Sequence, residues 1–138
     1  MQFVRLTFAA LAWLYLGLVA FQVFLAGAGV FGAASFELHR GVGYLAAFLG
    51  PLILLLAAIV ARAGRLVGLA AVVLVLGIIQ SILPWLREDA PYLAALHPVN
   101  ALLLAWLALT IATRATALVR ARGNPPAEAS GVSQVTQA

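Results

Sequence analysis

The sequence predicts an all-α integral membrane protein, an up-down bundle of four transmembrane helices. Of its 138 residues, 65% are hydrophobic and only 9% are charged, whereas a soluble domain carries about 25% charged residues. The mean hydropathy is +1.11. Four apolar runs follow one another along the chain, each close to or longer than the about 20 residues that cross a bilayer as a helix. Because lipid offers the backbone no hydrogen-bond partners, such runs must be helical.

The elements can be placed in order along a predicted transmembrane domain of residues 1–122. Ser35 is a suitable N-cap for the second helix. Pro51 falls in the middle of that helix and removes a backbone hydrogen bond, so we expect a kink there. Residues 123–138 are polar and contain proline, which predicts a disordered cytoplasmic tail. The four helices are predicted at residues 6–31, 38–61, 66–86 and 98–119.

The arginines predict the orientation in the membrane. All the basic residues are arginines, and only two of them, Arg40 and Arg87, lie on one side of the predicted bundle. Basic residues accumulate on the cytoplasmic side of a membrane, so both termini are expected there. The arginine-only, alanine-rich usage indicates a bacterial genome, and hence the bacterial cytoplasmic (inner) membrane. The six arginines on the predicted cytoplasmic side are Arg5, Arg62, Arg65, Arg114, Arg120 and Arg122.

Because the arginines are scattered at helix ends, topology explains them better than a nucleic-acid partner does. The lipid bilayer is the predicted partner. The apolar helices also contain Gln22 and Gln80. An unpaired amide is costly to bury, so each is expected to have an interhelical partner. Gln80 lies near the outer third of its helix, where it would approach a bound group.

His39 and His97 are the only histidines, and they head the second and fourth helices on the same, outer side. These helices are usually diagonal in a four-helix bundle, about 11–14 Å apart when neighbouring axes are 8–10 Å apart. Two imidazoles and one iron fit across that gap. Helical spacing places small residues below each histidine, beginning with Gly43 and Ala101. The competing interpretation is ordinary helix packing through small residues, with interfacial histidines.

Haem b is the group that this pattern favours. The absence of cysteine excludes thiolate metal sites and c-type haem attachment. Zinc needs about four ligands, and only acidic residues such as Glu37, Glu88 and Asp89 would complete them. Haem b needs His39 and His97 alone as metal ligands, and its propionates would meet Arg40 and Arg87 on the outer side. Asn100 follows His97 by nearly one turn and would orient that histidine or bond a backbone carbonyl.

Two segments also resemble heme A synthase. The stretch F36-E-L-H-R-G-V-G-Y44 resembles the Glu-x-x-His-Arg signature of that family's second helix, and L96-H-P-V-N-A-L-L-L104 resembles its fourth-helix histidine segment. Small four-helix bacterial membrane proteins of unknown function show similar HR-x-x-G and LHP-x-N segments. The resemblance implies axial ligation by His39 and His97 and a following Arg40. Glu37 precedes His39 by two residues rather than three, so a haem-b-binding bundle is implied more than haem A synthesis.

The function expected from these residues is electron transfer or haem handling by a bis-histidine, cytochrome b-like membrane protein. A quinone, another redox protein, a second copy of the chain or a larger membrane complex would be its partner. One alternative is a cofactor-free accessory or assembly subunit. The other is a haem-modifying enzyme, for which Glu37 is the candidate carboxylate. No catalytic residue is assigned, since no nucleophile and base are paired in the sequence.

Overall fold

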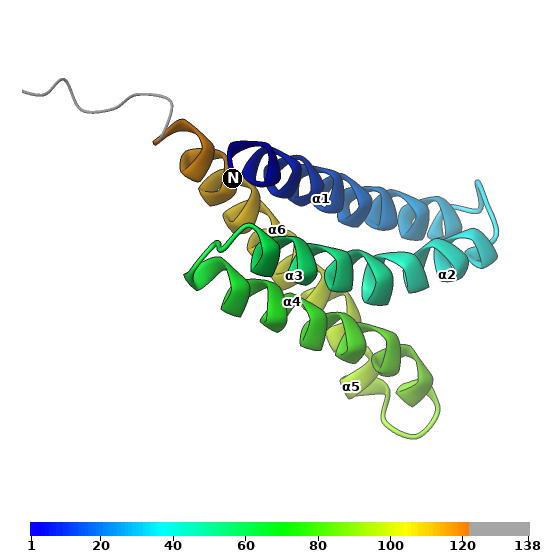
Figure 1. Ribbon diagram of the computed structural model, residues 1–138. Helices are drawn as coiled ribbons and strands as arrows, with labels where there is room; N and C mark the ends of the chain where they lie inside the picture. The colour runs from blue at the N-terminus through cyan, green and yellow to red at the C-terminus, as the bar shows by residue number, and fades with distance from the viewer. Residues whose placement is uncertain (122–138) are drawn as a thin grey trace, which may run out of the picture.

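The computed structural model describes residues 1–121 and is helical through most of them. Four helical segments are long and apolar enough to span a membrane, which confirms the predicted four-helix membrane bundle. Three of these spans combine more than one element (Figure 1). The elements are α1 (Gln2–Val30), α2 (Phe36–Tyr44), η1 (Leu45–Leu49), α3 (Gly50–Val60), α4 (Arg65–Ile82), η2 (Leu83–Arg87), α5 (Pro91–Ala94) and α6 (Leu96–Arg120).

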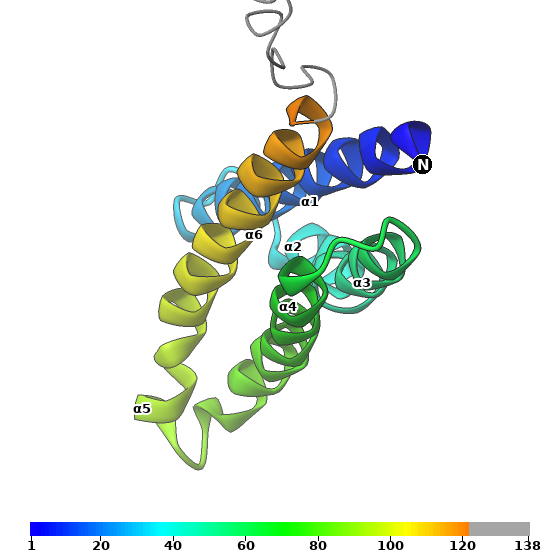
Figure 2. The same cartoon turned by 60° about the vertical axis from the view of Figure 1, so that its left-hand side comes forward.

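The spans run up and down in sequence. The N-terminus, the α3–α4 turn and the end of α6 lie at one end of the bundle, and the α1–α2 and α4–α5 links lie at the other (Figure 1). Figure 2 shows the same arrangement after rotation, with α6 beside α1 and α4 beside α3. Each span packs against the next, and α6 packs against α1. The second span, α2 to α3, therefore lies diagonally opposite α6, as predicted.

Small residues form much of the core, and large apolar side chains face outward. Ala12, Ala58, Ala70, Ala108 and Ala112 have no exposed surface. Lipid gives helices no hydrophobic reason to associate, so close backbone approach through small residues supplies the packing. Many leucines, isoleucines and phenylalanines are exposed on the outside of the bundle. This apolar outer surface is what a multi-pass protein presents to the bilayer.

Several helix boundaries differ from the predicted ones by a few residues. α1 begins at Gln2 rather than at residue 6. Ser35 precedes α2 with an extended backbone, but its side chain makes no capping hydrogen bond. α6 begins at Leu96 and not at Pro98, since the turn of α5 leads into it through a helical backbone at Ala95. The predicted tail and Arg122 lie outside the described residues.

A π-helical turn, Leu45–Leu49, lies directly before α3 and Pro51, and the kink expected at Pro51 itself stays a prediction. Pro51 has no N–H to offer the carbonyl of Ala47, and π-bulges are a recognised cause of helix distortion. A Cβ atom added at Gly77 of α4 would overlap the oxygen of Ala47. The freed carbonyl therefore lies against the one position of α4 where the missing side chain leaves room for it.

Candidate functional site

The two histidines meet inside the bundle. His39 comes from the first turns of α2 and His97 from the first turn of α6. Their ring centres are 6.2 Å apart, and the ring planes are inclined at 78°. Both side chains are half-buried. The diagonal arrangement of these two spans thus brings together the residues that the sequence analysis paired.

A chain of hydrogen bonds fixes His97. Its Nδ1 lies 3.0 Å from the backbone oxygen of Gln80, and its Nε2 lies 3.3 Å from the Gln80 amide nitrogen. Both contacts are satisfied when the proton is on Nδ1, so that Nδ1 donates and Nε2 accepts. Asn100 in turn donates to Oε1 of Gln80 at 2.7 Å and to the carbonyl of Leu76 at 2.9 Å. The prediction that Asn100 bonds a backbone carbonyl is confirmed.

His39 is held by a glutamine of α1, Gln22. Its Nδ1 lies 3.2 Å from the backbone oxygen of Gln22. The Gln22 amide fits best with its oxygen 3.2 Å from the Gly43 N–H and its nitrogen 3.0 Å from the His39 carbonyl. That nitrogen also lies 3.1 Å from Nδ1 of His39. A protonated Nδ1 donates to the Gln22 carbonyl, whereas an unprotonated one accepts from the amide.

These contacts reveal an internal two-helix repeat. In both halves the histidine Nδ1 approaches the backbone oxygen of the glutamine 17 residues earlier. A shift of 58 residues places Gln22 on Gln80 and His39 on His97. The first hairpin, α1 to α3, and the second, α4 to α6, therefore each contribute one glutamine and one histidine. The same shift also matches Leu25 with Leu83, Leu38 with Leu96, Ala47 with Ala105, and Leu49 with Leu107.

From the sequence alone, each glutamine amide was expected to find a partner on a neighbouring helix, but its link to a histidine was not predicted. That expectation is confirmed, because Gln80 bonds to His97 and Asn100 of α6. The signal that identifies the pairs is the 58-residue repeat, which a self-comparison of the sequence would reveal.

The charged residues of the predicted site stay at the surface. Glu37, Arg40 and Arg87 are exposed, and no hydrogen bond or ion pair joins them to either histidine in the described part of the chain. Arg87 forms an ion pair with Glu88 at 3.3 Å, with both side chains largely in solvent. Across residues 1–121, no three histidine or acidic side chains gather as a metal site would require. The zinc alternative therefore lacks its acidic ligands.

The distance between the two rings can be compared with that of two imidazoles that share one metal ion. An imidazole nitrogen binds a first-row metal at about 2 Å, and the ring centre lies about 1.1 Å behind it. Two imidazoles on opposite sides of one ion therefore have ring centres about 6 Å apart, which agrees with the 6.2 Å found here. Gly43 and Ala101 follow one turn below the two histidines and are half-buried.

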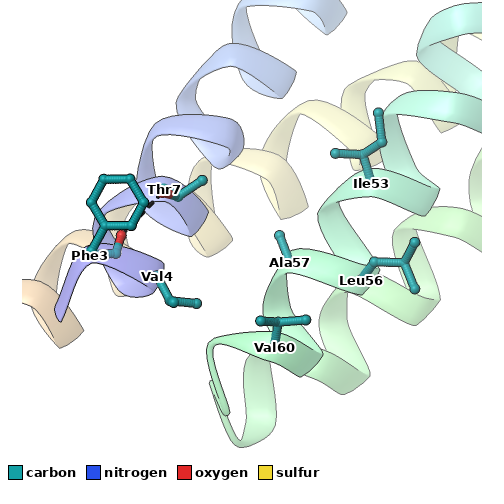
Figure 3. Close-up of a pocket in the computed structure, with 7 residues that line it drawn as sticks. All are labelled: Phe3, Val4, Thr7, Ile53, Leu56, Ala57 and Val60. Atoms are coloured by element: carbon teal, nitrogen blue, oxygen red, sulfur yellow. Dashed lines mark hydrogen bonds between the residues drawn. The ribbon is translucent and has the colours of Figure 1, made fainter. Parts of the chain in front are cut away.

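A separate hollow lies at the other end of the bundle (Figure 3). This open groove of about 400 Å³ runs between the start of α1 and the end of α3. Thr7 provides its only polar side chain, and that hydroxyl donates to the carbonyl of Phe3. The groove thus offers a bound molecule apolar contact only. Its lining residues are Phe3, Val4, Thr7, Ile53, Leu56, Ala57 and Val60.

The fold and the paired histidines define this chain as a multi-pass helical membrane protein with a two-histidine site. A sequence model for a family of unknown function (DUF6220) matches residues 22–85, which is less than half of the chain. The matched segment contains Gln22, His39 and Gln80 and ends before His97. No curated protein and no solved structure matches the chain.

Proposed function

We propose that this protein binds one haem b between His39 and His97 and serves in electron transfer or haem handling. The observation that supports the proposal is the juxtaposition of the chain's only two histidines, with ring centres 6.2 Å apart. They come from diagonal helices and from equivalent positions of the repeat. We place the protein in the bacterial cytoplasmic membrane, with both termini cytoplasmic and the histidines near the outer face.

The protein's own contribution is to orient and prepare the two imidazoles. The backbone carbonyls of Gln22 and Gln80 lie within hydrogen-bond distance of the Nδ1 atoms. A proton held there puts the lone pair of each ring on Nε2 and makes that nitrogen a better metal ligand; in His97 this lone pair accepts from the Gln80 amide. Bound haem b supplies a reversible one-electron centre. With His39 and His97 both holding the iron, no position would be left for oxygen activation, so electron transfer is the favoured role.

The outer end of the bundle provides the remaining contacts in this proposal. Arg40 and Arg87 are at the same end as the histidines and are exposed, so their side chains are available to propionates. Electrons would pass to or from a quinone or another redox protein at this end. The site contains both ligands within one chain, and a second copy or a larger membrane complex would add an electron partner.

A cofactor-free accessory subunit is the second candidate, and one observation favours it. The amide of Gln80 already occupies Nε2 of His97, so both ring nitrogens of this histidine have partners without iron. Ring centres about 4.5–7 Å apart are also ordinary for an edge-to-face aromatic pair, as His39 and His97 form here. Under this interpretation the histidines join two hairpins. A haem-modifying role for Glu37 has less support, because that carboxylate is exposed.

A reduced-minus-oxidised visible spectrum of the detergent-purified protein tests the proposal. We expect a sharp low-spin b-type α band that is lost in both His39→Ala and His97→Ala. The matched control is Tyr92→Ala, which changes a side chain that is 90% exposed at the same end. A protein that stays colourless after haem is supplied would support the accessory subunit instead. Activity on haem that disappears in Glu37→Gln would support the enzyme.

A further inference from the structure

We infer that the Gln80 amide is a displaceable cover on His97, held in place by Asn100, and that the two histidines are therefore unequal ligands. Nε2 of His39 is open to a ligand, whereas a ligand at Nε2 of His97 first has to displace the Gln80 amide. The inference rests on the proposed function for the identity of the competing group. The cover itself is a property of the chain and has a test that requires no haem.

The competition follows from the chemistry of one nitrogen. Nε2 of a neutral imidazole has a single lone pair when the proton is on Nδ1. In His97 that lone pair accepts from the Gln80 amide at 3.3 Å, so a metal and the amide cannot use it together. Displacement breaks this one hydrogen bond and transfers no proton, because Nδ1 keeps its bond to the Gln80 carbonyl at 3.0 Å.

Asn100 is the residue that aims the amide. Its Nδ2 donates to Oε1 of Gln80 at 2.7 Å and is itself anchored on the Leu76 carbonyl at 2.9 Å. With Oε1 held on that side, the amide nitrogen of Gln80 is turned toward His97. Asn100 is also buried, so water does not compete for these bonds. It is a positioning residue that acts through Gln80.

The repeat shows that the cover is specific to one half. The residue equivalent to Asn100 in the first hairpin is Val42, which has no amide to hold Gln22. The Gln22 amide nitrogen lies instead near the carbonyl and Nδ1 of His39, and its oxygen lies near the Gly43 N–H. Nε2 of His39 has no hydrogen bond within the described residues. The two glutamines therefore contact different nitrogens of their histidines, Nε2 in His97 and Nδ1 in His39.

The test measures how fast each imidazole of the haem-free, full-length protein reacts with diethyl pyrocarbonate, read by mass spectrometry. The reagent needs the Nε2 lone pair, so a cover slows it. In Gln80→Leu we expect His97 to react about two- to tenfold faster, the range that one net hydrogen bond supports, while His39 keeps its rate. Asn100→Leu should give part of that increase. Gln22→Leu is the matched control and should leave the His97 rate unchanged.

Gln80→Met serves as a second variant of similar length, and circular dichroism in micelles confirms that each variant is folded. Folded Gln80 variants with an unchanged His97 rate would overturn the cover. Titration with hemin then tests the competition, with tighter binding by Gln80→Leu than by the unmodified protein as the supporting result. Equal affinities would overturn the competition. If no form of the protein binds hemin, the proposed function and the competition are overturned. If His97 of the Gln80 variants still reacts faster with diethyl pyrocarbonate in that case, the cover on His97 is retained.

Discussion

The amides of Gln22, Gln80 and Asn100 lie inside the bundle, and each makes contacts on a neighbouring span. In a membrane such interhelical bonds contribute about 0.6–2 kcal/mol each. Their larger effect here is on the histidines, because the glutamine amides determine which ring nitrogens already have a hydrogen-bond partner. Under the proposed function, the two histidines would specify where the iron binds, and the amides would decide how readily each imidazole is available to it.

Tyr15 is the contrasting case. It is 4% exposed, and its hydroxyl has no hydrogen-bond partner among the described residues. Burying an unpaired hydroxyl costs about 1–3 kcal/mol. Tyr15→Phe should therefore raise the free energy of unfolding in micelles by about 1 kcal/mol, measured by reversible unfolding in a mixed detergent. Tyr44→Phe is the control, since Tyr44 faces outward, and should have little effect. A clear loss of stability in Tyr15→Phe would show that the hydroxyl is paired.

At the scale of elements, a close helix contact joins the π-helical turn to α4. Gly77→Ala would place a Cβ onto the oxygen of Ala47, so the second and third spans must separate. We expect destabilisation of about 1–3 kcal/mol, as overpacking usually causes. Gly68→Ala is the matched control in the same helix, because a Cβ there meets nothing within 4 Å. Thermal unfolding of both variants measures the difference, and equal melting temperatures would contradict the close approach.

The sequence predicted the spans well because length and hydropathy alone decide what crosses a bilayer. Helix ends were less predictable, since they depend on local backbone choices. The turn of α5 shows this, because Pro91 is preorganised for a first helical position and extends the fourth span by several residues. Pro51 predicted a kink, but only the structure shows the π-helical turn that precedes it and packs on Gly77.

At the scale of the whole molecule, each of two successive hairpins, α1 to α3 and α4 to α6, contributes one glutamine and one histidine to the site. This organisation explains why the pairing of His39 with His97 could be predicted from topology, since diagonal helices of a four-helix bundle present their inner faces to each other. The hydrogen bonds of Gln22 and Gln80 could not be predicted that way. They depend on which carbonyl and which amide reach the ring, and hence on helix rotation and on single residues such as Asn100.

The distribution of arginines along the bundle axis leads to the last prediction, which concerns orientation. Among the described residues, Arg5, Arg62, Arg65, Arg114 and Arg120 lie toward the end that carries the N-terminus, and Arg40 and Arg87 lie toward the other. Because positive charge is retained in the cytoplasm, that first end should be cytoplasmic.

Single-cysteine variants report this orientation directly, since the natural chain has no cysteine. A membrane-impermeant maleimide applied to intact spheroplasts should label Ser35→Cys, in the link between α1 and α2. It should label Ala121→Cys, directly after α6, only once the membrane is permeabilised. Both positions are exposed, so a difference reports sidedness and not burial. The reverse pattern would place the histidines on the cytoplasmic side, and their electron partner would then have to be a cytoplasmic one.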